Sequence, residues 1–237
     1  MTTNNNMDKE RLHLFHNYLH EEKIINKKHI ILSGILATLV YCIAVAIGGA
    51  IRPGYSHISQ FISELIATGA PNKSLLDLMF AVYNILTTVF AWLFFETVQT
   101  QGGNPKRAIG IAGTLILFAQ GIFGMATLFF PQDPVGTPFT TTGILHIVLA
   151  GLSSLTTMAG MLLVGFWLRA NTQLKPYGVY SFASVAFVFI FGGMAAAMAA
   201  NQSPISGLIE RLTIGGFLQW MAVISLILFF KVRDKTH

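Results

Sequence analysis

Six long apolar runs are the feature that most limits how this chain can fold. Each comes close to the roughly 20 residues that an α-helix needs to cross a hydrocarbon core of about 30 Å. A soluble helical protein would show polar faces at the helical period, and these runs lack them. The sequence therefore predicts an all-α fold, a polytopic membrane bundle of six transmembrane helices. The runs lie near residues 30–51, 75–98, 108–130, 144–168, 178–200 and 208–230.

The composition agrees with this prediction. Hydrophobic residues make up 53% of the 237 residues and charged residues only 11%, against roughly 25% charged in an average soluble domain. The single cysteine, Cys42, excludes an intramolecular disulfide. We predict three parts: a cytoplasmic N-terminal segment (1–29), a membrane domain (30–231) and a cytoplasmic tail (232–237).

Lysine and arginine are distributed unequally between the segments that flank the runs. The N-terminal segment, the second and fourth connections and the tail together hold 12 of them, whereas the first, third and fifth connections hold 3. Because positive residues concentrate on the cytoplasmic side, we expect both termini in the cytoplasm and residues 52–73 outside. The net charge of +5 is dispersed over these segments, so it indicates membrane lipids as partners and no nucleic acid.

The N-terminal segment has a pattern of its own. Residues 8–26 are predicted to form an amphipathic helix. We interpret it as a surface helix on the cytoplasmic leaflet, although histidines at spacings of three and four can also hold a metal. Its apolar face and its neighbouring histidine face are Leu12, Phe15 and Leu19, and His13, His16 and His20.

The first connection, RPGYSHISQFISEL at 52–65, is unusually polar for this chain. Pro53 and Gly54 end the first helix, and Ser56 can cap a new one. We expect a short amphipathic helix that lies on the outer membrane surface or folds back against the bundle. Its apolar stripe would be Ile58, Phe61, Ile62, Leu65 and Ile66, opposite a face with His57, Gln60 and Glu64.

Other ionisable residues gather in the half of the bundle that we predict to be outside. Glu210 lies about six residues into the sixth helix, and a charge at that depth is costly unless it faces protein or a wet cavity. We expect Arg52 to be its partner, with His57 or His146 as alternatives. Within the spans, Asn84, Gln120 and Gln219 can join helices by hydrogen bonds. The candidate residues of an outer site are Arg52, Ser56, His57, Glu64, Asp133, His146, Glu210 and Arg211.

Several short motifs together resemble a bacterial and archaeal membrane family, domain of unknown function 998. The likeness covers roughly residues 30 to 231 and implies a six-helix protein of a prokaryotic cell membrane. It implies no reaction and no cofactor. The matching motifs are Pro-Gly-Tyr-Ser (53–56), Ile-Ser-Glu-Leu (62–65), Gly-Ala-Pro (69–71), Pro-x-Asp-Pro (131–134), Gly-x-x-His (143–146) and Gly-Leu-x-Glu-Arg-Leu (207–212).

Two classes of function remain open from the residues. In the first, the outer groups bind or transport a lipid head group or small solute. Arg52 and Arg211 would hold its anionic part, and Glu64, Asp133 and Glu210 would position these arginines or bind a cation. We favour this class, although a purely structural role is a third option.

In the second class, the chain is a metal-dependent enzyme that acts on lipid at the outer leaflet. Two histidines and two carboxylates are an adequate set for zinc, which would activate water. The chain has no HExxH, Gly-x-Ser-x-Gly or Walker signature, so no standard hydrolase or ATPase is indicated. The alternative metal set is His57, Asp133, His146 and Glu210.

Overall fold

The computed structural model describes residues 32–100, 103–201 and 203–231. The histidine-bearing segment predicted at 8–26 and the tail after residue 231 lie outside the described residues. All six long elements of the described part are α-helices that are long and apolar enough to cross a membrane. The fold class predicted from the apolar runs is therefore confirmed. The helices are α2 (Ser33–Ile51), α3 (Lys73–Thr100), α4 (Arg107–Phe129), α5 (Thr141–Arg169), α6 (Lys175–Ala200) and α7 (Ser206–Lys231).

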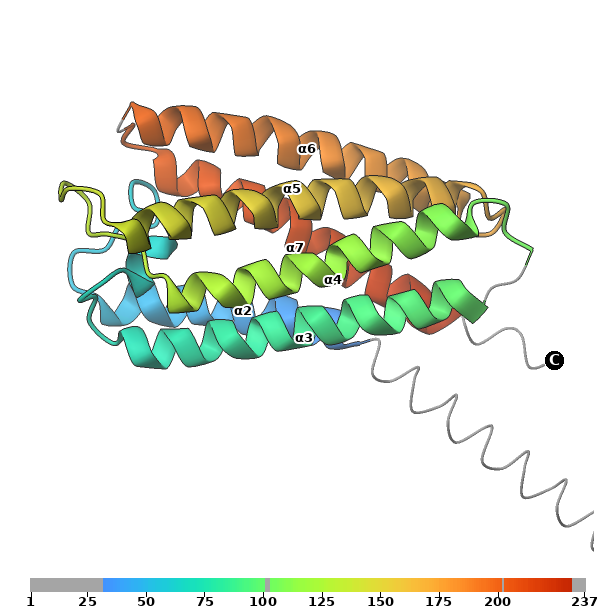
Figure 1. Ribbon diagram of the computed structural model, residues 1–237, viewed down its shortest axis with the longest axis horizontal. Helices are drawn as coiled ribbons and strands as arrows, with labels where there is room; N and C mark the ends of the chain where they lie inside the picture. Colours follow the sequence, from blue (N-terminus) through green and yellow to red (C-terminus); the bar gives the residue numbers. More distant parts are fainter. Residues whose placement is uncertain (1–31, 101–102, 202, 232–237) are drawn as a thin grey trace, which may run out of the picture.

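The helices run alternately up and down, so that their connections gather at two ends of one bundle (Figure 1). One end carries the short 3-10 helix η1 (Ser63–Ile66) and the 130–140 loop, and we call it the η1 end. The opposite end carries the α3–α4 and α5–α6 connections with their basic residues. Among the described residues, this arrangement separates Lys106, Arg107, Arg169, Lys175 and Lys231 from Arg52, Lys73 and Arg211 at the η1 end. Which end faces the cytoplasm stays a prediction.

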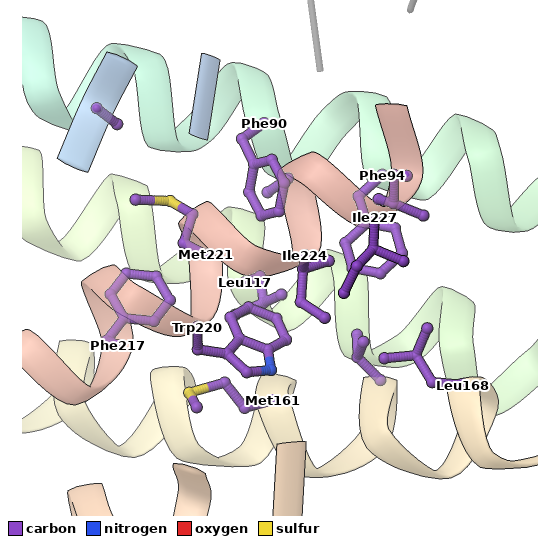
Figure 2. Close-up of a cluster of buried hydrophobic side chains, with 14 of the residues drawn as sticks. Phe90, Phe94, Leu117, Met161, Leu168, Phe217, Trp220, Met221, Ile224 and Ile227 are labelled. Carbon is purple, nitrogen blue, oxygen red and sulfur yellow. The ribbon is translucent and has the colours of Figure 1, made fainter. Parts of the chain in front are cut away.

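The central part of helix α7 is buried in the hydrophobic core of the bundle. The side chains of Trp220, Met221 and Ile224 are completely buried. Figure 2 shows them between the aromatic rings of α3, Leu117 of α4 and Met161 of α5. The indole Nε1 of Trp220 donates a hydrogen bond to the Ser181 hydroxyl at 2.9 Å, which satisfies its only polar atom.

Glycines bring the helices together towards the opposite end. A Cβ atom at Gly178 of α6 would lie 2.7 Å from the backbone nitrogen of Arg169 and from the carbonyl oxygen of Gly165, both in α5. A Cβ atom at Gly113 of α4 would lie 2.9 Å from the backbone nitrogen of Val164. Membrane helices associate through such close contact, because lipid tails compete equally well for apolar side chains.

The segment after α2 departs from the predicted helix. Instead of one amphipathic helix from Ser56 to about residue 68, the structure has turns followed by η1. Leu65 is completely buried against α2 and α3, and Ile58 is exposed. The segment therefore folds back onto the bundle, which was one of the two orientations considered. We call residues 52–68 the roof.

Candidate functional site

Side-chain hydrogen bonds supplement the backbone turns that hold the roof. Arg52 donates to the carbonyl oxygen of Glu64. Arg211 Nη1 donates to the carbonyl oxygen of Gln60 at 2.8 Å, and the Tyr55 hydroxyl donates to that of Phe61 at 2.8 Å. The carbonyl oxygens of Glu64 and Phe61 also accept, at 3.4 and 3.3 Å, from the backbone nitrogens of Ala67 and Glu64, so the side chains add to the backbone bonds of the turns. The conformation of the roof thus depends on side-chain contacts that the spacing of its apolar residues does not reveal.

Two carboxylates bind the N–H groups of the same segment. Glu64 is buried, and its Oε1 accepts from the backbone nitrogen of Phe61 at 2.9 Å. Glu210 reaches up from α7, and its Oε2 accepts from the backbone nitrogen of Ile62 at 2.5 Å. No ion pair joins Glu210 to Arg52, although both lie in the described residues. The pairing expected from the sequence was therefore wrong, and the two residues instead bind neighbouring backbone groups of the roof.

Tyr55 lies between the two arginines and was missed as a site residue. The Cζ atoms of Arg52 and Arg211 lie 5.7 and 5.6 Å from its ring centroid, within cation–π range. Arg211 Nη2 also donates to the Tyr55 hydroxyl at 2.6 Å. Partial burial raises the pKa of Tyr55, and the positive charge of Arg211 opposes this rise. The tyrosine of the Pro-Gly-Tyr-Ser motif was the available signal.

His57 and Ser56 lie at the outer surface of the roof. The His57 ring packs edge-on against Tyr55, with centroids 5.2 Å apart, and its Nε2 lies against Gly49 of α2. This partial burial lowers the pKa of His57, and the charge of Arg211 lowers it further. The Ser56 hydroxyl accepts a long hydrogen bond, 3.3 Å, from the Ser59 backbone nitrogen. Neither residue faces the interior of the bundle.

Asp133 fastens the loop that precedes α5. Its Oδ2 accepts from the backbone nitrogen of Thr140 at 2.8 Å, and its Oδ1 accepts from the Thr140 hydroxyl at 2.7 Å. The Thr140 side chain in turn caps α5 by accepting from the backbone nitrogen of Gly143 at 3.1 Å, which is the usual role of threonine there. Both Asp133 oxygens thus serve the loop and the start of the helix.

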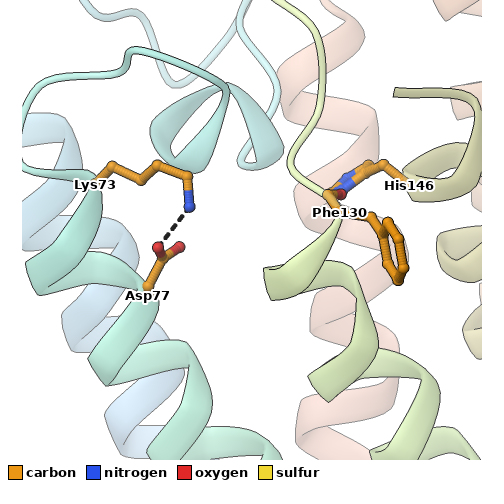
Figure 3. Close-up of polar contacts among 4 residues, drawn as sticks. All are labelled: Lys73, Asp77, Phe130 and His146. Carbon is orange, nitrogen blue, oxygen red and sulfur yellow. Dashed lines mark hydrogen bonds and ion pairs between the residues drawn. The ribbon is translucent and has the colours of Figure 1, made fainter. Parts of the chain in front are cut away.

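His146 is buried in the second turn of α5 and faces the end of α4. Its Nδ1 lies 2.8 Å from the carbonyl oxygen of Phe130, and Figure 3 shows the two residues next to each other. A carbonyl oxygen only accepts, so Nδ1 carries the proton and a neutral His146 keeps the lone pair of Nε2 for another partner. The same figure shows the ion pair of Lys73 with Asp77 at the start of α3.

Beneath the roof lies a cavity of about 290 Å³ that all six helices and η1 line. Of the eight candidate residues, His146 and Glu210 line it. The other six lie outside the cavity lining: Arg52, Ser56, His57 and Glu64 in the roof, Asp133 in the 130–140 loop, and Arg211 in α7. The cavity also has a polar lining that was not predicted as a site: Tyr41, Ser63, Tyr83, Asn84, Gln120, Thr127, Ser153, Ser154, Thr157 and Thr213.

Two amide oxygens of this lining have no hydrogen-bond partner, those of Asn84 and Gln120. Both side chains are only 4% exposed. Asn84 Nδ2 donates to the carbonyl oxygen of Phe80 at 2.9 Å, so Oδ1 is left as the free acceptor; it packs against Gly124, 2.3 Å from where a Cβ of that residue would lie. A buried carbonyl oxygen without a partner costs about 1–3 kcal/mol. Such atoms in a cavity are typical of a site that a ligand or water completes.

The polar residues within the spans differ in the helices that they join. Gln120 Nε2 donates to the Ser153 hydroxyl of α5 at 3.4 Å, and Gln219 Nε2 donates to that of Ser184 in α6 at 3.3 Å. These bonds cross between helices, as predicted. Asn84 instead binds the backbone of its own helix. Its interhelical role was therefore not found, and its free oxygen belongs to the cavity.

The four residues of the alternative metal set do not come together. Among the described residues, no three histidine, cysteine, aspartate or glutamate side chains lie close enough to hold a metal ion. His57 lies on the outer surface of the roof, and both oxygens of Asp133 bind Thr140. The geometry thus favours a cavity with hydrogen-bonding walls over a metal centre built from this set.

Comparison with known proteins agrees with the resemblance noted in the sequence. Residues 35–227 match a family described as protein of unknown function (DUF998). This match includes the roof, the 130–140 loop and every residue that lines the cavity. No curated protein and no solved structure matches the chain.

Proposed function

The chain belongs to the DUF998 family, and we propose that this multi-pass membrane protein uses the cavity beneath its roof to bind or transport a lipid head group or small solute. A volume of about 290 Å³ is at the lower limit of small-molecule sites. It suits a head group or a compact solute and is too small for a whole lipid.

The unpartnered oxygens of Asn84 and Gln120 carry this proposal. They come from different helices, α3 and α4, and both belong to the lining of the same cavity. Each one destabilises the empty protein, and unlike the unpartnered Trp167 nitrogen of the packed core, both line a space that a ligand can occupy. A ligand that donates hydrogen bonds offsets that cost. This is why we favour binding over a purely structural role.

The position of Glu210 supports the same proposal. Its carboxylate lines the cavity and also accepts from the Ile62 backbone nitrogen of the roof. A group bound in the cavity and the roof above it therefore share one side chain. Transport would require the roof or the cavity wall to open, and Glu210 connects the two.

A space-filling substitution tests the proposal. Ala195 of α6 lines the cavity, whereas the neighbouring Ala196 is exposed on the outside of the bundle. We expect wild-type protein and Ala196→Phe, purified in mild detergent, to retain a small molecule or lipid that Ala195→Phe loses. Mass spectrometry of the extracted protein measures this. Equal retention of every bound species by all three proteins would argue against the cavity as the binding site.

A further inference from the structure

The cavity is closed on most sides by direct side-chain packing. On the α3–α4 side, Gly121 lies against Thr88. On the α2 side, the Tyr41 ring packs on Phe80 and Tyr83, with centroids 5.2 and 4.7 Å away. The roof covers the η1 end, and the buried side chains of Val188 and Phe217 line the cavity towards the core. Gln120 bonds to Ser153 between α4 and α5, Gly192 lies against Thr213 between α6 and α7, and Thr38 bonds to the Leu218 carbonyl oxygen between α2 and α7. The side that these contacts leave is the one between α5 and α6.

Helices α5 and α6 separate on that side. They are in backbone contact near Gly178 and diverge towards the η1 end, as Figure 1 shows. In the divergent part, Gly151 of α5 and Gly193 of α6 have open space where a Cβ would point. Ser154 of α5 is exposed on the bundle surface and yet lines the cavity. The cavity therefore opens sideways, at a depth where lipid surrounds a transmembrane bundle.

The chemistry of the lining is rich in acceptors and poor in cations. Glu210 supplies a carboxylate, Asn84 and Gln120 supply unpartnered amide oxygens, and His146 keeps a lone pair on Nε2. No lysine or arginine belongs to the lining, which lies wholly in the described residues. Arg211 directly follows Glu210 in the sequence, but its Nη atoms donate to Gln60, Gly207 and Tyr55, outside the cavity.

We propose that the ligand is a lipid with a primary ammonium head group, which enters from the bilayer between α5 and α6. This proposal rests on the proposed function of the cavity and specifies its ligand. The ammonium would place its positive charge against Glu210 and donate hydrogen bonds to the amide oxygens of Asn84 and Gln120. The acyl chains would stay in the bilayer outside Ser154. Arg52 and Arg211, which the sequence suggested as anion ligands, already donate to carbonyl oxygens of the roof, although the Nε of Arg211 has no partner.

Short-chain lipids with different head groups test the chemistry. Binding of dihexanoyl-phosphatidylethanolamine, dihexanoyl-phosphatidylcholine, dihexanoyl-phosphatidylglycerol and free ethanolamine to detergent-solubilised full-length protein is measured by titration, with thermal shift as a second readout. We expect the ethanolamine lipid to bind at least about tenfold more tightly than the glycerol lipid, since hydrogen bonds to charged groups contribute about 1.5–3 kcal/mol. The choline lipid should bind less tightly than the ethanolamine lipid, because it carries the charge without N–H donors.

Each other ranking overturns a part of the inference. Equal binding of the glycerol lipid overturns the ammonium class, and equal binding of the choline lipid overturns hydrogen-bond donation. Free ethanolamine that binds as tightly as the lipid overturns the lipid source and the lateral route. If none of these probes binds but Ala195→Phe still loses a co-purified species, the ligand class fails and the proposed function stands. If none of the probes binds and Ala195→Phe also retains the co-purified species, both the ligand class and the proposed function fail.

Matched variants connect the binding to named residues. Glu210→Gln keeps an oxygen that can accept from Ile62, so the roof is retained while the charge is lost. We expect it to weaken binding of the ethanolamine lipid at least about tenfold, whereas Asp77→Asn, a carboxylate outside the cavity, leaves binding unchanged. Should Glu210→Gln not fold, Asn84→Leu provides the second test. Ser154→Trp should slow lipid binding, and Leu155→Trp, on the exposed face of α5, should not. Unchanged binding in the cavity variants would overturn the assignment.

Discussion

The region around Trp220 and the region beneath the roof use the same six helices in different ways. Around Trp220, aromatic and aliphatic side chains fill the space between α3, α4, α5 and α7. Beneath the roof, the same helices enclose a cavity of about 290 Å³ with polar walls. The first region satisfies the indole nitrogen of Trp220 but leaves that of Trp167 without a partner, whereas the second leaves two acceptors, the oxygens of Asn84 and Gln120, without partners around an open space.

This difference indicates that the region beneath the roof contributes less to the stability of the fold than the region around Trp220. Cavities cost free energy because their walls lose packing contacts, and buried acceptors without donors add to that cost. A bundle built for stability alone would fill the space beneath the roof with leucine or phenylalanine, as it does around Trp220. The polar region instead occupies the part of the bundle where the roof and Glu210 meet. The comparison thus supports a binding role there.

The two ends should differ completely in their accessibility from outside the cell. Ser59 at the η1 end and Thr172 at the opposite end are both exposed. In a Cys42→Ala background, we expect Ser59→Cys to react with an impermeant thiol reagent in intact cells. Thr172→Cys should react only after lysis, because the excess of lysine and arginine predicts that its end is cytoplasmic. The reverse pattern would invert the topology and move the cavity to the cytoplasmic leaflet.

Truncation should affect stability far more around Trp220 than beneath the roof. We expect Trp220→Ala to lower the free energy of unfolding by about 3–5 kcal/mol. Thr213→Ala in the cavity wall removes only a hydrogen bond to Ile209 of its own helix, so about 0.6 kcal/mol is expected. Unfolding of the solubilised proteins by denaturant measures both. Similar losses would mean that the cavity region is packed as tightly as the core.

The sequence predicted the core region better than the roof, for a physical reason. An apolar run determines its helix locally, and the first run, expected at 30–51, forms α2 at Ser33–Ile51. The apolar residues of the roof recur at the helical period, which predicted a helix. Its observed conformation depends on Glu210 and Arg211, which reach it from α7, far along the chain. No local pattern records such contacts.

The cavity was also not predictable from local patterns in the sequence. Asn84 and Gln120 were visible as polar residues within apolar helices. That both face one space depends on how α3 and α4 rotate and pack, which glycines such as Gly121 and Gly124 allow. His146 and Glu210 were predicted because ionisable residues within a span are costly, and the structure places both at the cavity.

Within the roof, the contact of Arg211 with Tyr55 should be the strongest pairwise coupling. Arg211 donates to the Tyr55 hydroxyl and lies over its ring. A double-mutant cycle of Arg211→Ala and Tyr55→Phe should give a coupling energy of about 1–2 kcal/mol, within the range for contacting residues. The cycle of Arg52→Ala and Glu210→Ala should give less, since these two bind different roof groups. A larger coupling for the second pair would restore the ion pair first expected between them.

The smallest expected effect is a pH dependence at the outer surface of the roof. The pKa of His57 is lowered from its usual value near 6.5, first by burial against α2 and then by Arg211. The unfolded chain then binds the proton more readily, so stability from a neutral His57 is complete above about pH 6.5 and is lost as the pH falls towards the folded pKa. We expect His57→Gln to reduce slightly the loss of thermal stability between about pH 7.5 and 5.5. The effect is small because the ring is largely exposed to solvent.

His57 has no part in the cavity, so binding of the ethanolamine lipid at neutral pH should stay unchanged. A variant whose melting temperature follows the same pH curve as the wild type would show that His57 does not titrate with folding, and another group would then cause the pH dependence.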